Sequence, residues 1–388
     1  MSPASPLSRL AQAIRLSPRP RSCSSVAEAV RLSPRPTRSV AEPVRAWWSP
    51  HAGAEPVRLS LRVAALALAG ALALPASAAP AAPRPLEVLQ ATPLFQFTEP
   101  EVGAYLAHLH ATEPDLRKRV IHLARKNLGQ PYEIYLLGEA PFETHDPQPL
   151  YSLAKSDCVV FTEHTLAMAL SRDWSGFFRL LQRIRYRDGV LGVVTRNHFT
   201  EADWNPANRW LAEDITAAIA GDRARQWEAR IDRARFLRAR YKLETKVAVE
   251  QLRDTYLPYE HAALADPHVR EGDIVELVRG VVKPGAPETE TFGGNAWIGH
   301  LGLVARGPAG ELHVIHSAEP EVREESLAAL IARETAKNAE RDAAGKPRLL
   351  GFKFLRLAPD PLANLRTLDG PAAPKVTLPG ALPGSSGS

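Results

Sequence analysis

The sequence predicts an α+β protein in which helices precede an antiparallel sheet. From about residue 100 to residue 190, apolar residues recur at helical spacing, and segments beyond residue 270 have strand composition with turn residues between them. Helices followed by a run of strands are typical of an α+β fold whose helices pack on one side of the sheet. The strand-like segments are GDIVELVRG at 272–280, HLGLVARG at 300–307, ELHVIHSA at 311–318 and KPRLLGFKFLRL at 346–357.

Capping and breaking residues bound the helical segments of the first half. At 115–129, DLRKRVIHLARKNLG places its apolar residues on one face, and Gly129 ends the helix just before a proline. A second helix is expected from Cys158 to Leu170; it is apolar on nearly all sides, which predicts that it is buried. Between the two helices, PYEIYLLGE at 131–139 has the composition of a strand.

A charged segment separates the helices from the strands. We expect a helical insert at about 190–260, in which ARQWEARIDRARFLRARYKLE at 224–244 turns its alternating Arg and Glu towards solvent. The main domain is expected at 100–368. A linker at 79–99 would precede it, and a disordered Pro/Gly/Ser tail at 369–388 would follow it.

The N-terminal region differs from the rest in charge. Residues 1–62 contain ten arginines, no lysine and three glutamates, so they carry +7 in a chain whose net charge is +5. The remaining residues are slightly acidic, so no basic excess for nucleic acid persists if the first segment is removed. Residues 58–78 resemble a secretory signal peptide, because two arginines precede an apolar run, a proline and Ala-Ser-Ala. The alternative is a membrane anchor, for which the apolar run is short.

Residues 1–57 are expected not to pack. They are rich in Arg, Pro and Ser and repeat IRLSPRP as VRLSPRP, which indicates low complexity and either a start codon assigned too early or an extended leader. Processing at the signal peptide would export the protein to the periplasm or another extracytoplasmic compartment. It would also remove Cys23 and leave Cys158 alone, which makes Cys158 a candidate reactive thiol.

Cys158 and two histidine-bearing segments suggest a nucleophilic site. A thiol attacks as the thiolate, and a helix N-terminus with a nearby histidine lowers its pKa. Cys158 is expected to begin a helix, and the strand-like segments carry His300, His313 and His316. The period of two in a strand puts His313 and His316 on opposite faces. A cysteine followed along the chain by a histidine and then an orienting polar residue is the order of a papain-like site.

The segments LGQPY, SDCVVF, GDIV, HLGLV and VIHSA, in this order, resemble the NlpC-type superfamily of papain-fold cell-wall hydrolases. Within it, SDCVVFTEHTLAMAL, IRYRDG and TRNHF with a later DW resemble the N-acetylmuramoyl-L-alanine amidase-like family. The resemblance covers about residues 100–357. It implies a papain-like (NlpC-type) fold, in which N-terminal helices pack on an antiparallel sheet or barrel.

The resemblance also implies roles for individual residues. Cys158 would be the nucleophile, His300 the general base and acid, and His316 the residue that orients His300. Tyr132 would lie near the thiol, where its hydroxyl and the backbone N–H of Cys158 form an oxyanion hole; the alternative for Tyr132 is a core aromatic. Superfamily endopeptidases usually have Ser-Gly after the cysteine, whereas this sequence has Val-Val, which favours the amidase branch.

Three further residues are candidates for substrate binding. The planar guanidinium of Arg196 suits a carboxylate or a lactyl-peptide carbonyl, and His198 would line the same cleft. Arg196 has the alternative of pairing with a structural carboxylate. Asp157 either contacts substrate or stabilises the helix N-terminus.

Together these residues predict a monomeric cysteine amidase, without cofactor or metal, that hydrolyses the N-acetylmuramoyl-L-alanine bond of peptidoglycan or muropeptides. A γ-D-glutamyl-diamino-acid endopeptidase with the same triad is the first alternative. A zinc-dependent amidase would need ligands from among His198, His300, His313 and His316, and the sequence contains no H-E-x-x-H pair. A non-catalytic peptidoglycan-binding module would explain export but not the ordered triad.

Overall fold

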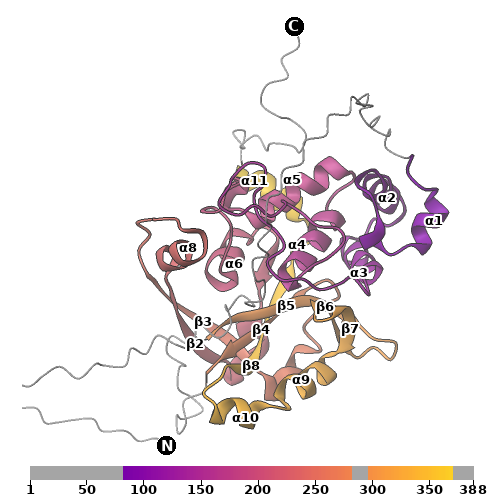
Figure 1. Ribbon diagram of the computed structural model, residues 1–388. Helices are drawn as coiled ribbons and strands as arrows, with labels where there is room; N and C mark the ends of the chain where they lie inside the picture. Colours follow the sequence, from indigo (N-terminus) through magenta and orange to yellow (C-terminus); the bar gives the residue numbers. More distant parts are fainter. Residues whose placement is uncertain (1–81, 282–295, 370–388) are drawn as a thin grey trace, which may run out of the picture. The chain divides into compact units, whose positions relative to one another are not determined.

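The structure is a computed structural model that describes residues 82–281 and 296–369 (Figure 1). All of these residues lie in one compact unit. Residues 1–57, the expected signal peptide at 58–78 and all but the first residue of the expected tail lie outside the described ranges. No helix within those ranges combines the length and apolar character needed to cross a bilayer.

Most of the helices precede the main strands, as the sequence predicts. The helices are α1 Leu86–Ala91, α2 Glu99–Thr112, α3 Leu116–Lys126, α4 Cys158–Ala169, α5 Trp174–Arg185, α6 Asn205–Ala207, α7 Thr216–Ala220, α8 Arg233–Tyr241, α9 Leu327–Thr335, α10 Asn338–Ala343 and α11 Pro361–Asp369. Shorter helical turns are η2 Leu94–Gln96, η3 Arg187–Gly189, η4 Thr200–Trp204, η5 Gly221–Arg223 and η6 Tyr259–Ala265.

Within the described residues, eight strands form one antiparallel sheet in the order β2-β3-β8-β4-β5-β6-β7, and β1 pairs with β8. The strands are β1 Ala212–Asp214, β2 Arg225–Ile231, β3 Glu250–Pro258, β4 Ile274–Gly280, β5 Ala296–Arg306, β6 Leu312–Ala318, β7 Glu321–Ser326 and β8 Arg348–Leu357. The expectation of helices followed by an antiparallel sheet is therefore confirmed.

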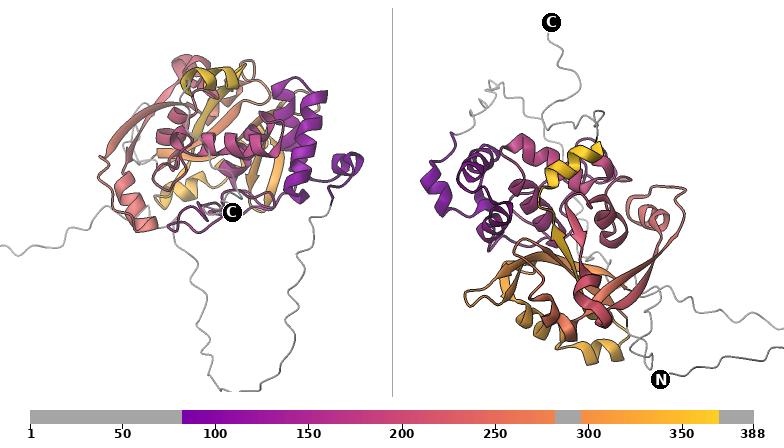
Figure 2. Two further views of the ribbon diagram at one scale, coloured as in Figure 1. Left: turned by 90° about the horizontal axis from the view of Figure 1, so that it is seen from above. Right: turned by 180° about the vertical axis from the view of Figure 1, so that it is seen from behind.

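Alternate residues of the central strands face two different cores. Leu303 and Ile315 pack with residues of α2, α3, α4 and α5, whereas Val304 and Val314 pack with residues of α7 and α9. Figure 1 and Figure 2 show the sheet with helices on both sides. The expectation that helices lie on one side only is wrong, because strands that are apolar at consecutive positions need cover on both faces.

The segment 79–99, expected to be a linker, is ordered from residue 82 onwards. It forms α1 and η2, and the side chains of Leu89, Leu94 and Phe97 are buried in the same core as α2 and α3. An ion pair between Arg84 and Glu101 ties its start to α2. The apolar side chains explain the difference from the expectation, since a solvated linker would leave them exposed.

The segment 131–139 is not a strand. Tyr132 makes a single bridge to Ser156, and Tyr135 has a φ of 62°, which is in the left-handed region and ends any extended run. The strand predicted from the composition of this segment is therefore wrong, and the segment forms a turn around the start of α4.

The insert is not wholly helical. Residues 225–231 form β2, which pairs with β3, and only the second half of the charged segment forms helix α8. In β2 the side chains of Trp227, Ala229 and Ile231 are buried and alternate with exposed or half-buried charged ones. Burial of every second side chain stabilises a strand. The packing of this apolar face therefore outweighs the charge pattern, which had suggested a helix.

Substitution of Trp227 tests whether β2 belongs to the core. Trp227→Ala removes a fully buried indole, and we expect the free energy of unfolding to fall by about 3–5 kcal/mol. Urea denaturation followed by circular dichroism would measure the loss. The neighbouring Gln226→Ala is the matched control, because Gln226 is exposed on the same strand. Equal unfolding midpoints for both variants would contradict the placement of β2.

Candidate active site

Cys158 is the first residue of α4, as the sequence predicts. Asp157 caps the helix by accepting a hydrogen bond of 2.8 Å from the backbone N–H of Val160. The backbone N–H of Tyr135 also points at the Asp157 carboxylate, so the turn at 131–139 wraps around the helix start. Every residue of α4 from Val160 to Ala169 is buried, whereas Cys158 is half-buried. Helix α4 is therefore held rigidly in the core, and the Cys158 thiol lies at the edge of that core.

The start of α4 is tied to the two strands that carry the candidate histidines. Ser317, which follows His316 on β6, donates a hydrogen bond of 2.9 Å from Oγ to the carbonyl of Ser156. On β5, the backbone N–H of Leu301, the residue after His300, partly offsets the raised pKa of Cys158. Helix α4 also packs against both strands.

The two histidines form the first links of a hydrogen-bonded chain. His300 Nε2 lies 2.6 Å from His316 Nδ1, and their rings meet edge to face. His316 Nε2 lies 2.8 Å from Oε1 of Glu325 on β7. The hydrogen bond that the structure shows for His300 is thus to His316 and not to Cys158. The order histidine, histidine, carboxylate fits the predicted orienting role of His316 and adds an acid behind it.

Burial favours the neutral forms of both the thiol and the imidazole. Desolvation, followed by the nearby Asp157 carboxylate, raises the pKa of Cys158 to about 12. Desolvation, His316 and nearby arginines lower the pKa of His300 well below its usual value. In the free protein the pair is therefore a thiol and a neutral imidazole, and thiolate formation needs proton transfer to a base.

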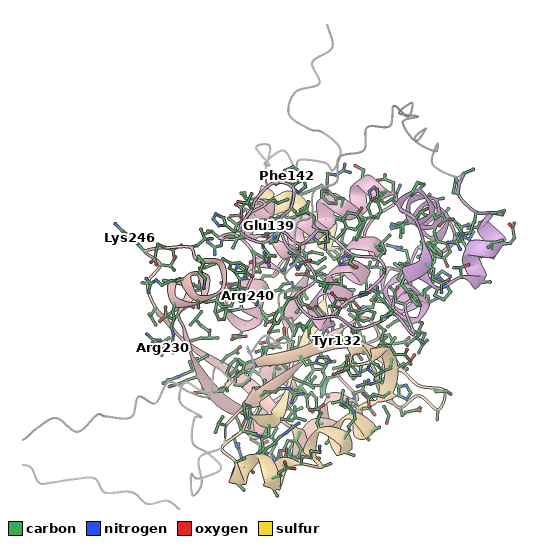
Figure 3. All side chains as sticks on the ribbon, in the orientation of Figure 1. Tyr132, Glu139, Phe142, Arg230, Arg240 and Lys246 are labelled. Carbon is green, nitrogen blue, oxygen red and sulfur yellow. The ribbon has the colours of Figure 1, made fainter. Side chains whose placement is uncertain are left out.

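Tyr132 lies where the helical layer meets the sheet (Figure 3). Its backbone N–H donates to the carbonyl of Pro320, and its side chain is half-buried. Burial raises its pKa, and the charges of Cys158 and Asp157 raise it further. Its backbone also forms a bridge to Ser156, two residues before Cys158. Tyr132 therefore stays protonated and can donate a hydrogen bond, as an oxyanion-hole residue must.

Residues 122–330, more than half of the chain, match the family described as N-acetylmuramoyl-L-alanine amidase-like. The chain belongs to this family. Among curated proteins none matches it significantly.

Solved structures also resemble this chain. A crystal structure of a Legionella pneumophila protein of the DUF1460 family is 19% identical with a TM-score of 0.55, and the match covers 67% of this chain and 94% of that one. At this identity the likeness shows the fold alone. Two structures of an N-acetylmuramoyl-L-alanine amidase from Bacteroides uniformis are each 21% identical, with TM-scores of 0.46 and 0.47. They cover 62% and 63% of this chain and 98% and 99% of theirs.

In this amidase-like chain, Arg196 is buried and paired with carboxylates. Its Nε donates to Glu139 at 2.7 Å and one terminal nitrogen donates to Asp146 at 2.9 Å, while Tyr241 lies under the guanidinium. Glu139 is fully buried and marked in Figure 3. The structure thus gives Arg196 the partners of the structural alternative, and a contact with substrate stays a prediction.

His198 belongs to the same packed region. Its Nε2 donates to the carbonyl of Val193 at 2.6 Å, and its ring contacts the rings of Phe236 and Tyr241. Burial, and then the charge of Arg196, lower the pKa of His198 to about 3, so its ring is neutral. A neutral histidine held by aromatic rings supports the insert, and its predicted place in a substrate cleft stays untested.

Of the four histidines considered as zinc ligands, His300 and His316 are in contact, but His313 and His198 have other partners. His313 lies between Glu311 and Glu324, whereas His316 faces His300 and Glu325. The expected opposite faces of these two histidines are confirmed. Within residues 82–281 and 296–369, no group of three or more His, Cys, Asp or Glu side chains is arranged to hold a metal ion.

Glu325 is the site residue that sequence reasoning missed. It lies on β7, a strand that the sequence did not predict, in the run EVREES. The pairing of His316 with Arg323 and of Ile315 with Glu324 fixes the register that brings Glu325 to the histidine. An acidic residue a few positions after VIHSA was the available signal, but its contact depends on this register.

The pH dependence of alkylation tests the state of the thiol. In a Cys23→Ser chain, Cys158 is the sole cysteine. Because its pKa is raised to about 12, the thiolate fraction grows with pH throughout the accessible range. We expect the iodoacetamide rate to rise about tenfold per unit from about pH 6 to about pH 9. Mass spectrometry of the alkylated peptide would follow it, and a plateau at neutral pH would instead show a preformed thiolate–imidazolium pair.

Removal of Arg196 tests its role. Arg196→Ala leaves Glu139 buried without its cation, so we expect the free energy of unfolding to fall by about 3–5 kcal/mol. Arg238→Ala is the matched control, since Arg238 forms an exposed ion pair with Glu244 and its loss should leave the denaturation midpoint unchanged. An Arg196→Ala protein of normal stability whose KM alone is raised would establish the substrate-binding alternative.

Proposed function

We propose that the protein is a cysteine-dependent amidase that hydrolyses the bond between the lactyl group of N-acetylmuramic acid and L-Ala in peptidoglycan or its fragments. The single observation that carries the proposal is the thiol at the start of a buried helix, tied to the neighbours of a hydrogen-bonded histidine pair. Membership of the N-acetylmuramoyl-L-alanine amidase-like family supports the choice of bond.

The proposed reaction begins when His300 takes the proton of the Cys158 thiol. The sulfur attacks the lactyl carbonyl carbon, and the tetrahedral oxyanion accepts hydrogen bonds from the Cys158 backbone N–H and the Tyr132 hydroxyl. The C–N bond breaks as His300 protonates the amine of L-Ala, which leaves a thioester. His300 then takes a proton from a water molecule as the water oxygen attacks the thioester carbon. The C–S bond breaks, His300 returns the proton to sulfur, and the lactyl carboxylic acid is released and ionises in water.

The neutral thiol and imidazole of the free protein suit this sequence of steps. A half-buried thiol with a raised pKa is protected from unwanted reactions until a base removes its proton. A substrate that displaces solvent brings the reacting groups into hydrogen-bond reach, since such contacts are often loose in free enzymes. In this proposal the helix α4 and strands β5 and β6 act as the two halves of a papain-like, NlpC-type catalytic centre.

The proposed substrate agrees with the proposed compartment. Residues 58–78 have the features of a secretory signal peptide, and cell-wall material lies outside the cytoplasm. In the proposal, the exported protein acts as a monomer and needs no cofactor, because one thiol and one imidazole perform every bond change.

A product analysis tests the proposal. Wild-type protein incubated with purified muropeptides is expected to release the intact stem peptide and a peptide-free sugar, both identified by mass spectrometry. Cys158→Ala should lower the rate at least about 10³-fold because no thioester can form. Cys23→Ser is the matched control and should retain full activity.

Other outcomes select the alternatives. A sugar that keeps L-Ala-D-Glu shows an endopeptidase with the same thiol. Loss of activity in EDTA, combined with resistance to iodoacetamide, shows a zinc-dependent amidase. Binding without turnover by the wild type shows a binding module, and full activity of Cys158→Ala rules out the thiol mechanism.

A further inference from the structure

We propose that Glu325 is a positioning residue that fixes the direction of the hydrogen bonds through His316 to His300, and so decides which nitrogen of His300 can accept a proton. The inference rests on the proposed function, in which His300 is the base for the thiol of Cys158. It assigns a role to a residue on β7 that lies beyond the predicted Cys–His–His order.

The carboxylate of Glu325 is firmly held. Its Oε1 accepts hydrogen bonds from His316 Nε2 at 2.8 Å and from a terminal nitrogen of Arg333 at 2.7 Å, with Arg323 Nε at 3.3 Å. Its side chain is 16% exposed. Burial alone would raise the pKa of Glu325, but the hydrogen bonds from His316 and Arg333 lower it to about 2. At neutral pH it is therefore ionised and can only accept hydrogen bonds.

A hydrogen-bond acceptor at Glu325 determines which nitrogen donates in each of the hydrogen bonds from Glu325 through His316 to His300. Because Glu325 cannot donate, His316 Nε2 must carry a hydrogen. Neutral imidazole has one N–H, so His316 Nδ1 is an acceptor, and His300 Nε2 must then be the donor across the 2.6 Å contact. This leaves His300 Nδ1 without a hydrogen. It is the nitrogen that can take a proton from a thiol.

Burial is the main cause that lowers the pKa of both rings and so favours their neutral forms, although the Glu325 carboxylate raises the pKa of His316. His316 faces His300 from β5, Glu325 and Arg323 from β7, and Arg333 from α9. The charges of Arg279, Arg323 and Arg333 also lower the pKa of His300. The arginines thus favour neutral imidazoles, while the carboxylate chooses the tautomer of each.

The substitution Glu325→Gln distinguishes an orienting role of Glu325 from a role in packing alone. Glu325→Gln keeps the size of the side chain, but its amide can donate to His316 Nε2 and reverse the chain, which would place the hydrogen of His300 on Nδ1. Glu324→Gln is the matched control, because Glu324 is the preceding residue, is 17% exposed and also contacts a histidine, His313. The two variants lose the same charge on opposite faces of β7.

We expect kcat on muropeptides to fall about 10²- to 10⁴-fold in Glu325→Gln, with KM within about twofold, since a wrong tautomer disables the base without removing substrate contacts. The fall should persist across the pH profile and should not track the melting temperature. Glu324→Gln should keep wild-type kcat. Equal losses in both variants, or a loss in Glu325→Gln that is fully explained by unfolding, overturn the proposal.

Nitrogen NMR of ¹⁵N-histidine-labelled, substrate-free protein provides a readout that does not depend on turnover. In the wild type, His316 should carry its hydrogen on Nε2 and His300 should carry its hydrogen on Nε2, and Glu325→Gln should move both hydrogens to Nδ1. Unchanged tautomers in Glu325→Gln overturn the proposal. If the tautomers move as expected but wild-type protein cleaves no muropeptide, the positioning by Glu325 stands and the proposed function fails.

Discussion

The hydrogen bonds around Ser156 are the constraint on which the candidate site depends. Ser317 Oγ donates to the carbonyl of Ser156, and Ser156 Oγ donates to Gln130 Oε1 at 2.7 Å. Gln130 Nε2 in turn donates to the carbonyl of Leu153 at 2.7 Å, which fixes the orientation of its amide. The side chains of Gln130, Ser156 and Ser317 are buried, so the loss of one of these hydrogen bonds would leave a desolvated polar atom without a partner. The network therefore sets the distance between the start of α4, where Cys158 lies, and β6, where His316 lies.

Buried charges hold the other side of the same helix. Glu163 on α4 accepts hydrogen bonds from Arg185 at 3.1 Å and from the indole of Trp204 at 3.0 Å. Such groups stabilise the fold only when each charge keeps its partner, so they specify one arrangement of α4, α5 and η4. With Arg196 and Glu139 nearby, the region between the helices and the insert becomes a rigid ionic core. Arg185 and Arg196, the cations of this core, are paired with the buried carboxylates Glu163 and Glu139.

Local patterns made the helices and the central strands predictable, whereas contacts between distant segments did not show in the sequence. Helix α4 follows from its capping aspartate and apolar run, and the histidine faces of β6 follow from the period of two. Strand β2 was not predicted because the Arg and Glu residues of segment 224–244 suggest a solvated helix, although Trp227, Ala229 and Ile231 alternate with polar residues. Glu325 was hidden because its contact with His316 arises from the β6–β7 register, which no local pattern encodes.

The packing of the helix and the hydrogen bonds of the histidines together determine where protons lie in the candidate site. Burial of α4 raises the pKa of the Cys158 thiol, and burial with nearby arginines lowers the pKa of His300, so neither side of the pair is charged at rest. A neutral pair reacts only if the accepting nitrogen of the imidazole is free, and that depends on its tautomer. In the proposal, the ionised Glu325 carboxylate fixes the tautomer of His300 through the two hydrogen bonds that connect them by way of His316. Strand β7, which the sequence did not predict, therefore supplies Glu325. In this proposal its carboxylate determines which nitrogen of His316 and of His300 carries the hydrogen.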